Sequence, residues 1–345
     1  MLTAKPSQVG YQYAINDTQS NSFLNGGYTS LSPQIFFEGR HTAKSIAARV
    51  TKDDLTDLEK AKSLAYWTFL HVRPQNAAPT SVIGDDYFNV LRRGWGYCDQ
   101  MAHVYSTLAT YAGVPSRQLQ LFRKDYGSPH TLAESLIDGR WVVIATWRGF
   151  VPVDSDGNPI TKEELANSPQ MNLFADLKPS DFLDAVPFYS YPYAPITTVL
   201  DRALNRIMRA FTPTTPTTPT TLDFKDLDLA KRANLNGDFE ESKKIYLKIL
   251  DSSASPRVKD QALFWLSVNL FDAGKFVESQ QRFELHKDSF PKSPFFISSS
   301  RFLAEIALSM GETEEALSIL KSMGSEQARV SAILVAEGKH PGLTR

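Results

Sequence analysis

Residues 212–221 consist only of threonine and proline, in the sequence TPTTPTTPTT. Such a run has no apolar side chains with which to build a core, and its prolines favour an extended spacer. We therefore expect a linker at 212–222 between two separately folded regions. A chain of 345 residues is long enough for two or more domains, and its 42% hydrophobic content can supply their cores.

The region after the linker, 223–345, contains an internal repeat. Gly237, Gly274 and Gly311 are 37 residues apart, and they open the similar phrases GDFEESKKIY, GKFVESQQRF and GETEEALSIL. The simplest interpretation is a pair of helices joined at each glycine, with the pairs stacked and the tail QARVSAILVAEG as a cap. The region resembles tetratricopeptide repeats, which implies that it binds a protein partner. A helical lid or a dimer surface remains open, because a solenoid fold does not fix function.

The chain has one cysteine, Cys98, in the sequence GWGYCDQ at 94–100. Apolar residues follow it at helical spacing, and Gly113 stands where a helix should end. We therefore expect Cys98 at a helix N-terminus, where free backbone N–H groups and the helix dipole favour a thiolate. The alternative is a cysteine packed in the core.

A predicted β-hairpin gives this thiol a candidate base. Asp138-Gly139 is typical of a two-residue turn between strands. With that turn, Leu132 lies opposite Ala145, and His130 lies diagonally across from Ala145 on the same face. In a Cys-His pair, a third residue, Asp or Asn, orients the imidazole ring. Position 145 is where that residue is expected.

Two segments, GWGYCDQMAHVYSTLATYAGVPSR and HTLAESLIDGRWVV, resemble the transglutaminase-like (papain-like) superfamily of bacterial type. LEKAKSLAYWTFLHVRP resembles the helix that precedes the cysteine in this superfamily, so the resemblance covers about residues 51–165. It implies an α+β domain in which Cys98 is the nucleophile and His130 the general base. The implied reaction is acyl transfer at an amide or peptide bond through a thioester, which ends in hydrolysis or in transfer to an amine.

The third position of the resemblance falls at Ala145, which cannot orient a histidine. Either the enzyme works with an incomplete triad, or the chain is a degenerate or disabled scaffold that binds without catalysis. Whether Ala145 is natural or engineered is left open. Glu134 is roughly 13 Å from His130 along the strand, at about 3.3 Å per residue, and so is too far to replace the missing carboxylate. Asp154, beyond the hairpin, is not placed by the sequence.

An acyl-transfer site also needs donors for the oxyanion. The backbone N–H of Cys98 is the natural first donor at a helix start. Trp95, Tyr97 and Gln100 are candidates for the second donor or for substrate contacts, although structural roles account for such residues equally well.

The expected architecture is therefore an α+β papain/transglutaminase-like domain at 51–211 and an all-α helical-repeat domain at 223–345, with 1–50 as an N-terminal extension packed on the catalytic domain. No metal site is expected, because the other histidines lack Cys or acidic neighbours at ligand spacing, and no cofactor is implied. A net charge of -1 without a basic block argues against a nucleic-acid partner.

Localisation is not fixed by the sequence. No run of 18 apolar residues predicts a transmembrane segment. The start, MLTAKPSQVG, lacks the apolar core of a signal peptide. A cytoplasmic protein, or an exported one whose signal has been removed, is expected. The predicted partners are a protein or peptide substrate and a protein that binds the helical repeats.

Overall fold

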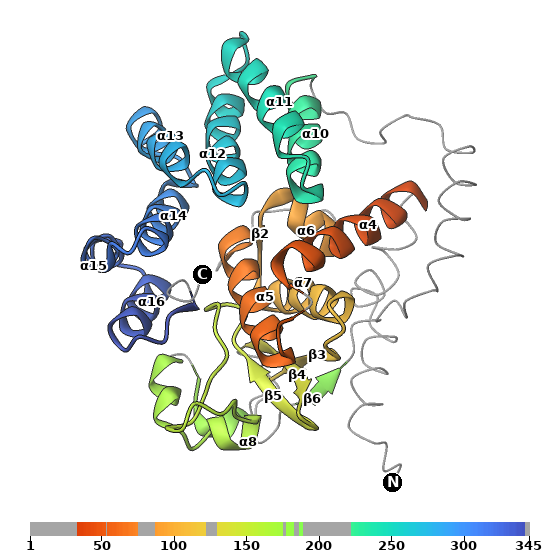
Figure 1. The fold of residues 1–345 in the computed structure, drawn as a ribbon, viewed down its shortest axis with the longest axis vertical. Coiled ribbons are helices and arrows are strands. Elements are labelled where there is room, and N and C mark those ends of the chain that lie inside the picture. Colours follow the sequence, from red (N-terminus) through yellow and green to blue (C-terminus); the bar gives the residue numbers. More distant parts are fainter. Residues whose placement is uncertain are drawn as a thin grey trace. The chain divides into compact units, whose positions relative to one another are not determined.

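The computed structural model describes residues 33–52, 54–74, 87–121, 130–174, 177–182, 186–188 and 222–341. The chain divides into two compact units, Met1–Pro213 and Thr214–Arg345, whose elements are labelled in Figure 1. The predicted linker at 212–222 lies outside the described residues except for Leu222, with which a helix begins.

The first unit contains a four-stranded antiparallel sheet in the order β5-β4-β3-β6. Its strands are β3 (Ser116–Gln120), β4 (Thr131–Ile137), β5 (Arg140–Ile144) and β6 (Val186–Phe188). The β4–β5 hairpin has the predicted register, with Ile137 opposite Arg140. Its turn residues, Asp138 and Gly139, have φ values of 49° and 77°. Because positive φ at both positions matches the right-handed twist of the strands, this dipeptide sets the register.

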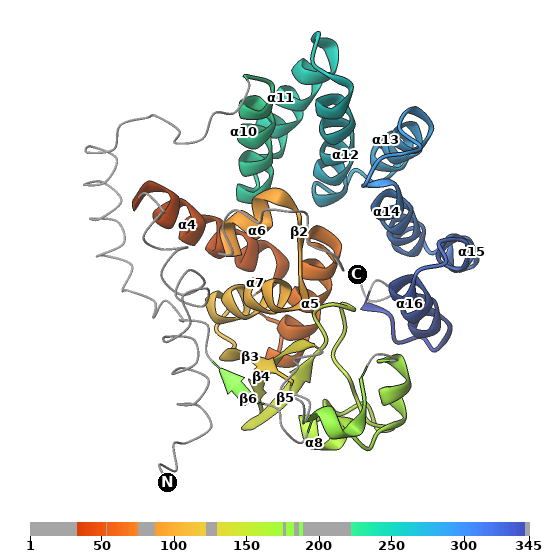
Figure 2. The same ribbon diagram turned by 180° about the vertical axis from the view of Figure 1, so that it is seen from behind.

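Helix α7 (Cys98–Tyr111) lies between the sheet and the other large helices of the unit, as both Figure 1 and Figure 2 show. Those helices are α4 (Pro33–Val50), α5 (Asp57–His71) and α6 (Tyr87–Arg93). The Tyr105 hydroxyl on α7 is 2.7 Å from Ser135 Oγ on β4, which in turn is 2.7 Å from Ser116 Oγ on β3. This buried chain of hydroxyls links the middle of α7 to strands β3 and β4 and so fixes the helix along the sheet.

The remaining elements of the unit are short. Strands β1 (Arg73–Pro74) and β2 (Trp95–Gly96) form a parallel pair. Helix α8 (Lys162–Leu165) and the 3₁₀ turns η2 (Pro169–Leu173) and η3 (Pro179–Phe182) follow the hairpin. Of the predicted N-terminal extension, residues 33–50 form α4, which packs against α7 and buries Ala43, Ile46 and Ala47.

The second unit is all helical in its described part. Its seven helices are α10 (Leu222–Asn236), α11 (Phe239–Asp251), α12 (Pro256–Asp272), α13 (Phe276–Ser289), α14 (Phe296–Ser309), α15 (Thr313–Ser322) and α16 (Glu326–Ala336). Gly237, Gly274 and Gly311 end the first helix of each pair with φ values of 89°, 72° and 82°. Left-handed backbone at this position is the usual way to close a helix, and glycine adopts it without strain. The pattern of one helix pair per glycine is confirmed.

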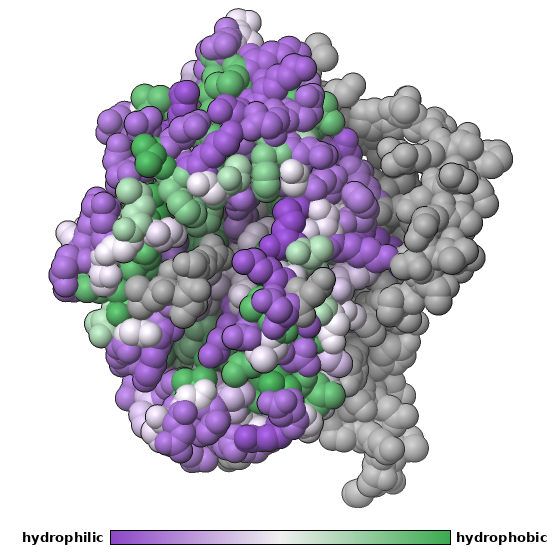
Figure 3. All heavy atoms as spheres, viewed as in Figure 1, coloured by the Kyte–Doolittle hydropathy of each residue, from purple (hydrophilic) through white to green (hydrophobic). Residues whose placement is uncertain are grey.

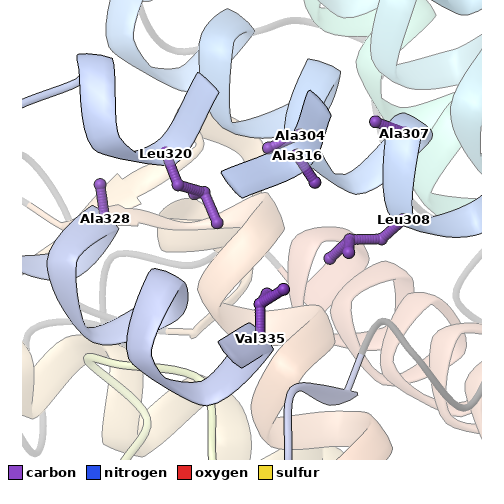
Figure 4. Packing of buried hydrophobic residues seen from close by; sticks show 7 residues of the cluster. All are labelled: Ala304, Ala307, Leu308, Ala316, Leu320, Ala328 and Val335. Carbon is purple, nitrogen blue, oxygen red and sulfur yellow. The ribbon is translucent and has the colours of Figure 1, made fainter. Parts of the chain in front are cut away.

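The repeat extends to buried side-chain contacts. Ser242 Oγ donates to the Ala230 carbonyl at 2.9 Å, and 37 residues later Ser279 Oγ donates to the Ser267 carbonyl at 2.8 Å. In the third pair, alanines replace these groups and form an apolar cluster with the last helix. Figure 4 shows the cluster: Ala304, Ala307, Leu308, Ala316, Leu320, Ala328 and Val335. Helix α16 supplies its last two members and so closes the stack, as expected of a cap.

Hydrophilic residues cover most of the coloured surface in Figure 3, and hydrophobic ones form small separate patches. Large exposed hydrophobic side chains occur in the helical unit, at Leu229, Val277, Leu285, Ile297 and Met310. Within the described ranges, no helix combines the length and apolar character needed to cross a bilayer.

Candidate active site

Two glycines bring the chain into α7, each for a different reason. Gly94 has φ of 72°, which turns the chain sharply after α6. At Gly96, a Cβ atom would lie 3.2 Å from atoms of Val90 and Gln100, so this position is glycine because space is short. The helix then begins at Cys98, as predicted.

Arg93 and Gln100 hold this entry in place. Arg93 Nε donates to the Trp95 carbonyl at 2.8 Å, and its Nη2 donates to Gln100 Oε1 at 2.5 Å. The guanidinium carbon lies 4.4 Å from the centre of the Trp95 ring. The same Gln100 oxygen accepts the Tyr97 N–H at 3.0 Å and thereby caps the helix. Three predicted oxyanion or substrate residues, Trp95, Tyr97 and Gln100, therefore share one network that fixes the backbone before Cys98.

The Cys98 sulfur lies where the N-terminus of α7 meets the start of β4. Hydrogen bonding with Thr131 and with the Asp99 backbone acts to lower the pKa of this thiol. Thr131 is the first residue of β4 and directly follows His130. Because α7 packs against β4 and His130 directly precedes β4, Cys98 and His130 belong to neighbouring elements, although they are 32 positions apart in the chain.

The ionisation of this thiol differs from the sequence expectation. Burial raises the pKa of Cys98 to about 11, and the negative charge of Asp99 acts in the same direction. The hydrogen bonds from Thr131 and Asp99 oppose this rise without overcoming it. The expectation of an easily ionised thiol considered the helix terminus alone, whereas desolvation of the charged form is the larger effect here.

His130 is 4% exposed and is fixed from two sides. Its carbonyl accepts the Leu121 N–H at 3.1 Å, which extends the β3–β4 pairing. Its ring meets the ring of Trp147 edge to face, with centroids 6.1 Å apart and planes at 85°. The sequence analysis missed Trp147, because its position depends on a turn after β5 that no local pattern announces.

That turn begins at Ala145, the predicted third position. Ala145 is fully buried, its N–H donates to the Phe150 carbonyl at 3.0 Å, and its carbonyl accepts the N–H groups of Arg148 and Gly149 at 3.0 and 2.8 Å. The chain therefore reverses at 146–149, and this reversal presents Trp147 to His130. Position 145 itself offers only a methyl group.

The two carboxylates weighed as substitutes have other partners. Glu134 is 2.8 Å from Arg117 Nη2 in a largely buried ion pair across β3 and β4. Asp154 Oδ1 accepts the N–H groups of Asp156 and Asn158 at 2.9 and 2.8 Å, which closes an exposed turn. Through these bonds, Asp154 stabilises its own loop.

A metal centre is not suggested by the residues that the structure describes. Within those ranges, no group of three or more His, Cys, Asp or Glu side chains could hold an ion. Burial lowers the pKa of His103, on the same helix as Cys98, to about 4, so this imidazole is neutral near neutral pH.

The part of the chain that contains Cys98 and His130 is similar to a known protein family. The sequence model of the transglutaminase-like superfamily matches residues 44–146. No curated protein matches the chain significantly. A solved structure of a "putative cysteine protease" from Cytophaga hutchinsonii is similar, with 16% identity and a TM-score of 0.28. The match covers 38% of this chain and 47% of that one, so it spans about half the length of the solved structure. The chain therefore carries a domain of the transglutaminase-like superfamily at residues 44–146.

Proposed function

We propose that the first unit is a cysteine hydrolase or acyltransferase that acts on an amide or peptide bond. In this proposal Cys98 is the nucleophile and His130 is the general base. The observation that carries it is the position of Cys98 at the N-terminus of α7, a helix that packs along β4, the strand that His130 directly precedes. The superfamily match supports cysteine hydrolase or transferase chemistry at family level.

The reaction follows from these positions. His130 takes the thiol proton while the sulfur attacks the amide carbon, and the backbone N–H of Cys98 stabilises the oxyanion. The C–N bond breaks as His130 returns the proton to the leaving amine, which leaves a thioester on Cys98. Water or a second amine then attacks the thioester, with His130 as base, and restores the thiol. Trp95, Tyr97 and Gln100 are the candidates for a second oxyanion donor or for substrate contacts.

The raised pKa of Cys98 bears on the first step. A thiol with a pKa of about 11 is protonated near neutral pH, so proton transfer to His130 has to accompany attack. Substrate binding displaces water from the site and changes this balance. The proposal therefore requires a base within reach of the sulfur, and His130 is the residue proposed for that role.

The helical unit is proposed to recruit a protein partner or a protein substrate in the manner of tetratricopeptide repeats. Support comes from the 37-residue period of Gly237, Gly274 and Gly311 and from the matching serine contacts of the first two pairs. A lid or a dimer surface is the alternative use of the same stack.

A second candidate function is a scaffold that has kept the fold and lost catalysis. Ala145 in the position of the orienting carboxylate favours it, and so does the raised pKa of Cys98. The scaffold and the enzyme differ in one respect that can be measured, which is turnover that depends on Cys98 and His130.

The test is hydrolysis and amine incorporation on a panel of peptide amides, including glutamine-containing peptides. The enzyme predicts turnover by the wild-type chain, none by Cys98→Ser, and a loss of at least about a hundredfold in His130→Ala, the scale of general-base catalysis. His41→Ala, at an exposed histidine on α4, is the matched control and should retain activity. No turnover on any substrate, or turnover that survives Cys98→Ser, contradicts the enzyme and favours the scaffold.

A further inference from the structure

We propose that Arg93 is a positioning residue for acyl transfer, which sets the direction of the Cys98 N–H before the substrate binds. The inference rests on the proposed function, in which this N–H stabilises the oxyanion. It gives a role in the reaction to a residue of α6, which acts through Gln100 on the first turn of α7.

Hydrogen bonds hold the peptide group that carries the Cys98 N–H. The other end of this planar group is the Tyr97 carbonyl, which accepts the Met101 N–H at 2.8 Å. The Tyr97 N–H donates to Gln100 Oε1 at 3.0 Å, so the residue before Cys98 is bonded through both of its backbone groups. Because Cys98 is the first residue of α7, its own N–H has no carbonyl to bond within the helix and points out of the helix N-terminus.

Arg93 fixes the orientation of the Gln100 amide. The planar guanidinium donates through Nε to the Trp95 carbonyl at 2.8 Å and through Nη2 to Gln100 Oε1 at 2.5 Å. Arg93 and the Tyr97 N–H therefore donate to the same oxygen. A turn of the amide by 180° would bring its NH₂ group against two donors, so the pair of bonds excludes the flipped form.

The strand pairing next to this entry does not extend to the cap. Strand β2 pairs with β1 through Trp95 and Gly96, and the pairing ends at Gly96, one residue before Tyr97. The step from Gly96 into α7 therefore depends on the Gln100 side chain, and Arg93 holds that side chain. Loss of Arg93 is expected to loosen the peptide group before Cys98 while the sheet and the helices remain.

Acylation and alkylation of Cys98 separate this role from a general effect on the thiol. In acylation by a p-nitrophenyl ester of a short acyl peptide, the sulfur adds to the carbonyl carbon. The carbonyl oxygen then carries negative charge until p-nitrophenolate leaves. In alkylation by iodoacetamide, the sulfur displaces iodide and no oxyanion forms. Cys98 is the only cysteine, so intact-mass spectrometry follows both reactions on one group.

Arg93→Met keeps the length of the side chain and removes its donors. Acylation is expected to fall roughly tenfold to a hundredfold, against about 10²–10³ for removal of an oxyanion donor, with alkylation within about twofold of wild type. Arg93→Lys keeps the charge but cannot donate to both acceptors, so its acylation rate should lie between the two. Arg92→Met is the matched control at the end of the same helix, where Arg92 Nη1 donates to Asn89 Oδ1 at 3.3 Å, and both of its rates should match wild type.

A double variant tests whether Arg93 acts through Gln100. Arg93→Met combined with Gln100→Met should lose no more acylation than Gln100→Met alone, because the two side chains form one network. Independent, multiplied losses would contradict this part of the inference.

An equal ratio of acylation to alkylation in Arg93→Met, Arg92→Met and wild type overturns the inference, and so does a parallel loss of both rates in Arg93→Met. If Arg93→Met does not fold by circular dichroism, Arg93→Lys against Arg92→Lys makes the same comparison. Wild-type protein that is alkylated but never acylated would defeat the proposed function and this inference with it. Wild-type acylation without an Arg93 effect would defeat only this inference.

Discussion

Substitution of Gly149 by alanine tests how the turn after β5 is built. Gly149 has φ of 74°, and a Cβ atom placed on it would lie 2.7 Å from Phe69 Cβ and 2.8 Å from two atoms of the Phe69 ring. Phe69 is itself buried on α5. An alanine here has to adopt left-handed backbone, which costs about 1–2 kcal/mol, and must also displace a packed ring, which costs about 1–3 kcal/mol. We expect a total loss of about 3 kcal/mol.

Gly157→Ala is the matched control. Gly157 has φ of 86°, but no atom lies within 4 Å of the added methyl group. Only the backbone cost of about 1–2 kcal/mol applies there. Four of the five tryptophans belong to the first unit, so urea unfolding followed by tryptophan fluorescence reports mainly on that unit. Equal losses in the two variants would refute the close approach to Phe69.

Ala145→Asp should speed alkylation of Cys98 near neutral pH and raise turnover, because a carboxylate there can accept the ring N–H of the candidate base; unchanged rates in both assays would mean that another group already orients the ring. His103 has a folded pKa of about 4, below its usual 6.5, so its contribution to stability is present above pH 6.5 and is lost as the pH falls towards 4. Wild type should therefore lose roughly 3 kcal/mol of unfolding free energy more than His103→Phe between pH 7 and pH 4, as measured by urea titrations, and parallel losses would contradict the assigned burial effect. Limited proteolysis should cut first within 212–221 and release two resistant fragments; protection of this segment would argue against a linker.

Local patterns in the sequence predicted several features of the structure correctly. The Asp138-Gly139 turn fixed the hairpin register, because positive φ at both positions is a property of those residues themselves. The start of α7 at Cys98 and the helix ends at the repeat glycines follow from equally local rules.

Features that depend on contacts between distant residues could not be predicted. The packing of α7, which begins at Cys98, along β4 depends on buried contacts between distant residues, such as Tyr105 with Ser135. The edge-on contact of Trp147 with His130 depends on the reversal after Ala145. Burial of the sulfur, which outweighs the helix terminus in the pKa of Cys98, is a property of the whole fold.

The hydrogen bonds of the Gln100 side-chain oxygen are a further example of contacts that the sequence does not predict. The residue type of Gln100 and its position, two after the cysteine, made it a candidate for oxyanion or substrate contacts. The structure shows that its side-chain oxygen accepts from Arg93 and from the Tyr97 N–H, which is a capping role. Sequence spacing predicted where Gln100 lies on the helix, whereas the direction of its side chain was set by Arg93 from the preceding helix.

The central claim is that Cys98 forms an acyl intermediate with the help of His130, and direct observation of that intermediate is its sharpest test. The protein is mixed with an activated p-nitrophenyl ester of a short acyl peptide, and intact mass is followed over time. The account predicts a single acyl adduct on the wild-type chain, no adduct on Cys98→Ser, and slower formation on His130→Ala. Absence of the adduct on the wild-type chain, or formation at an equal rate without His130, would contradict it.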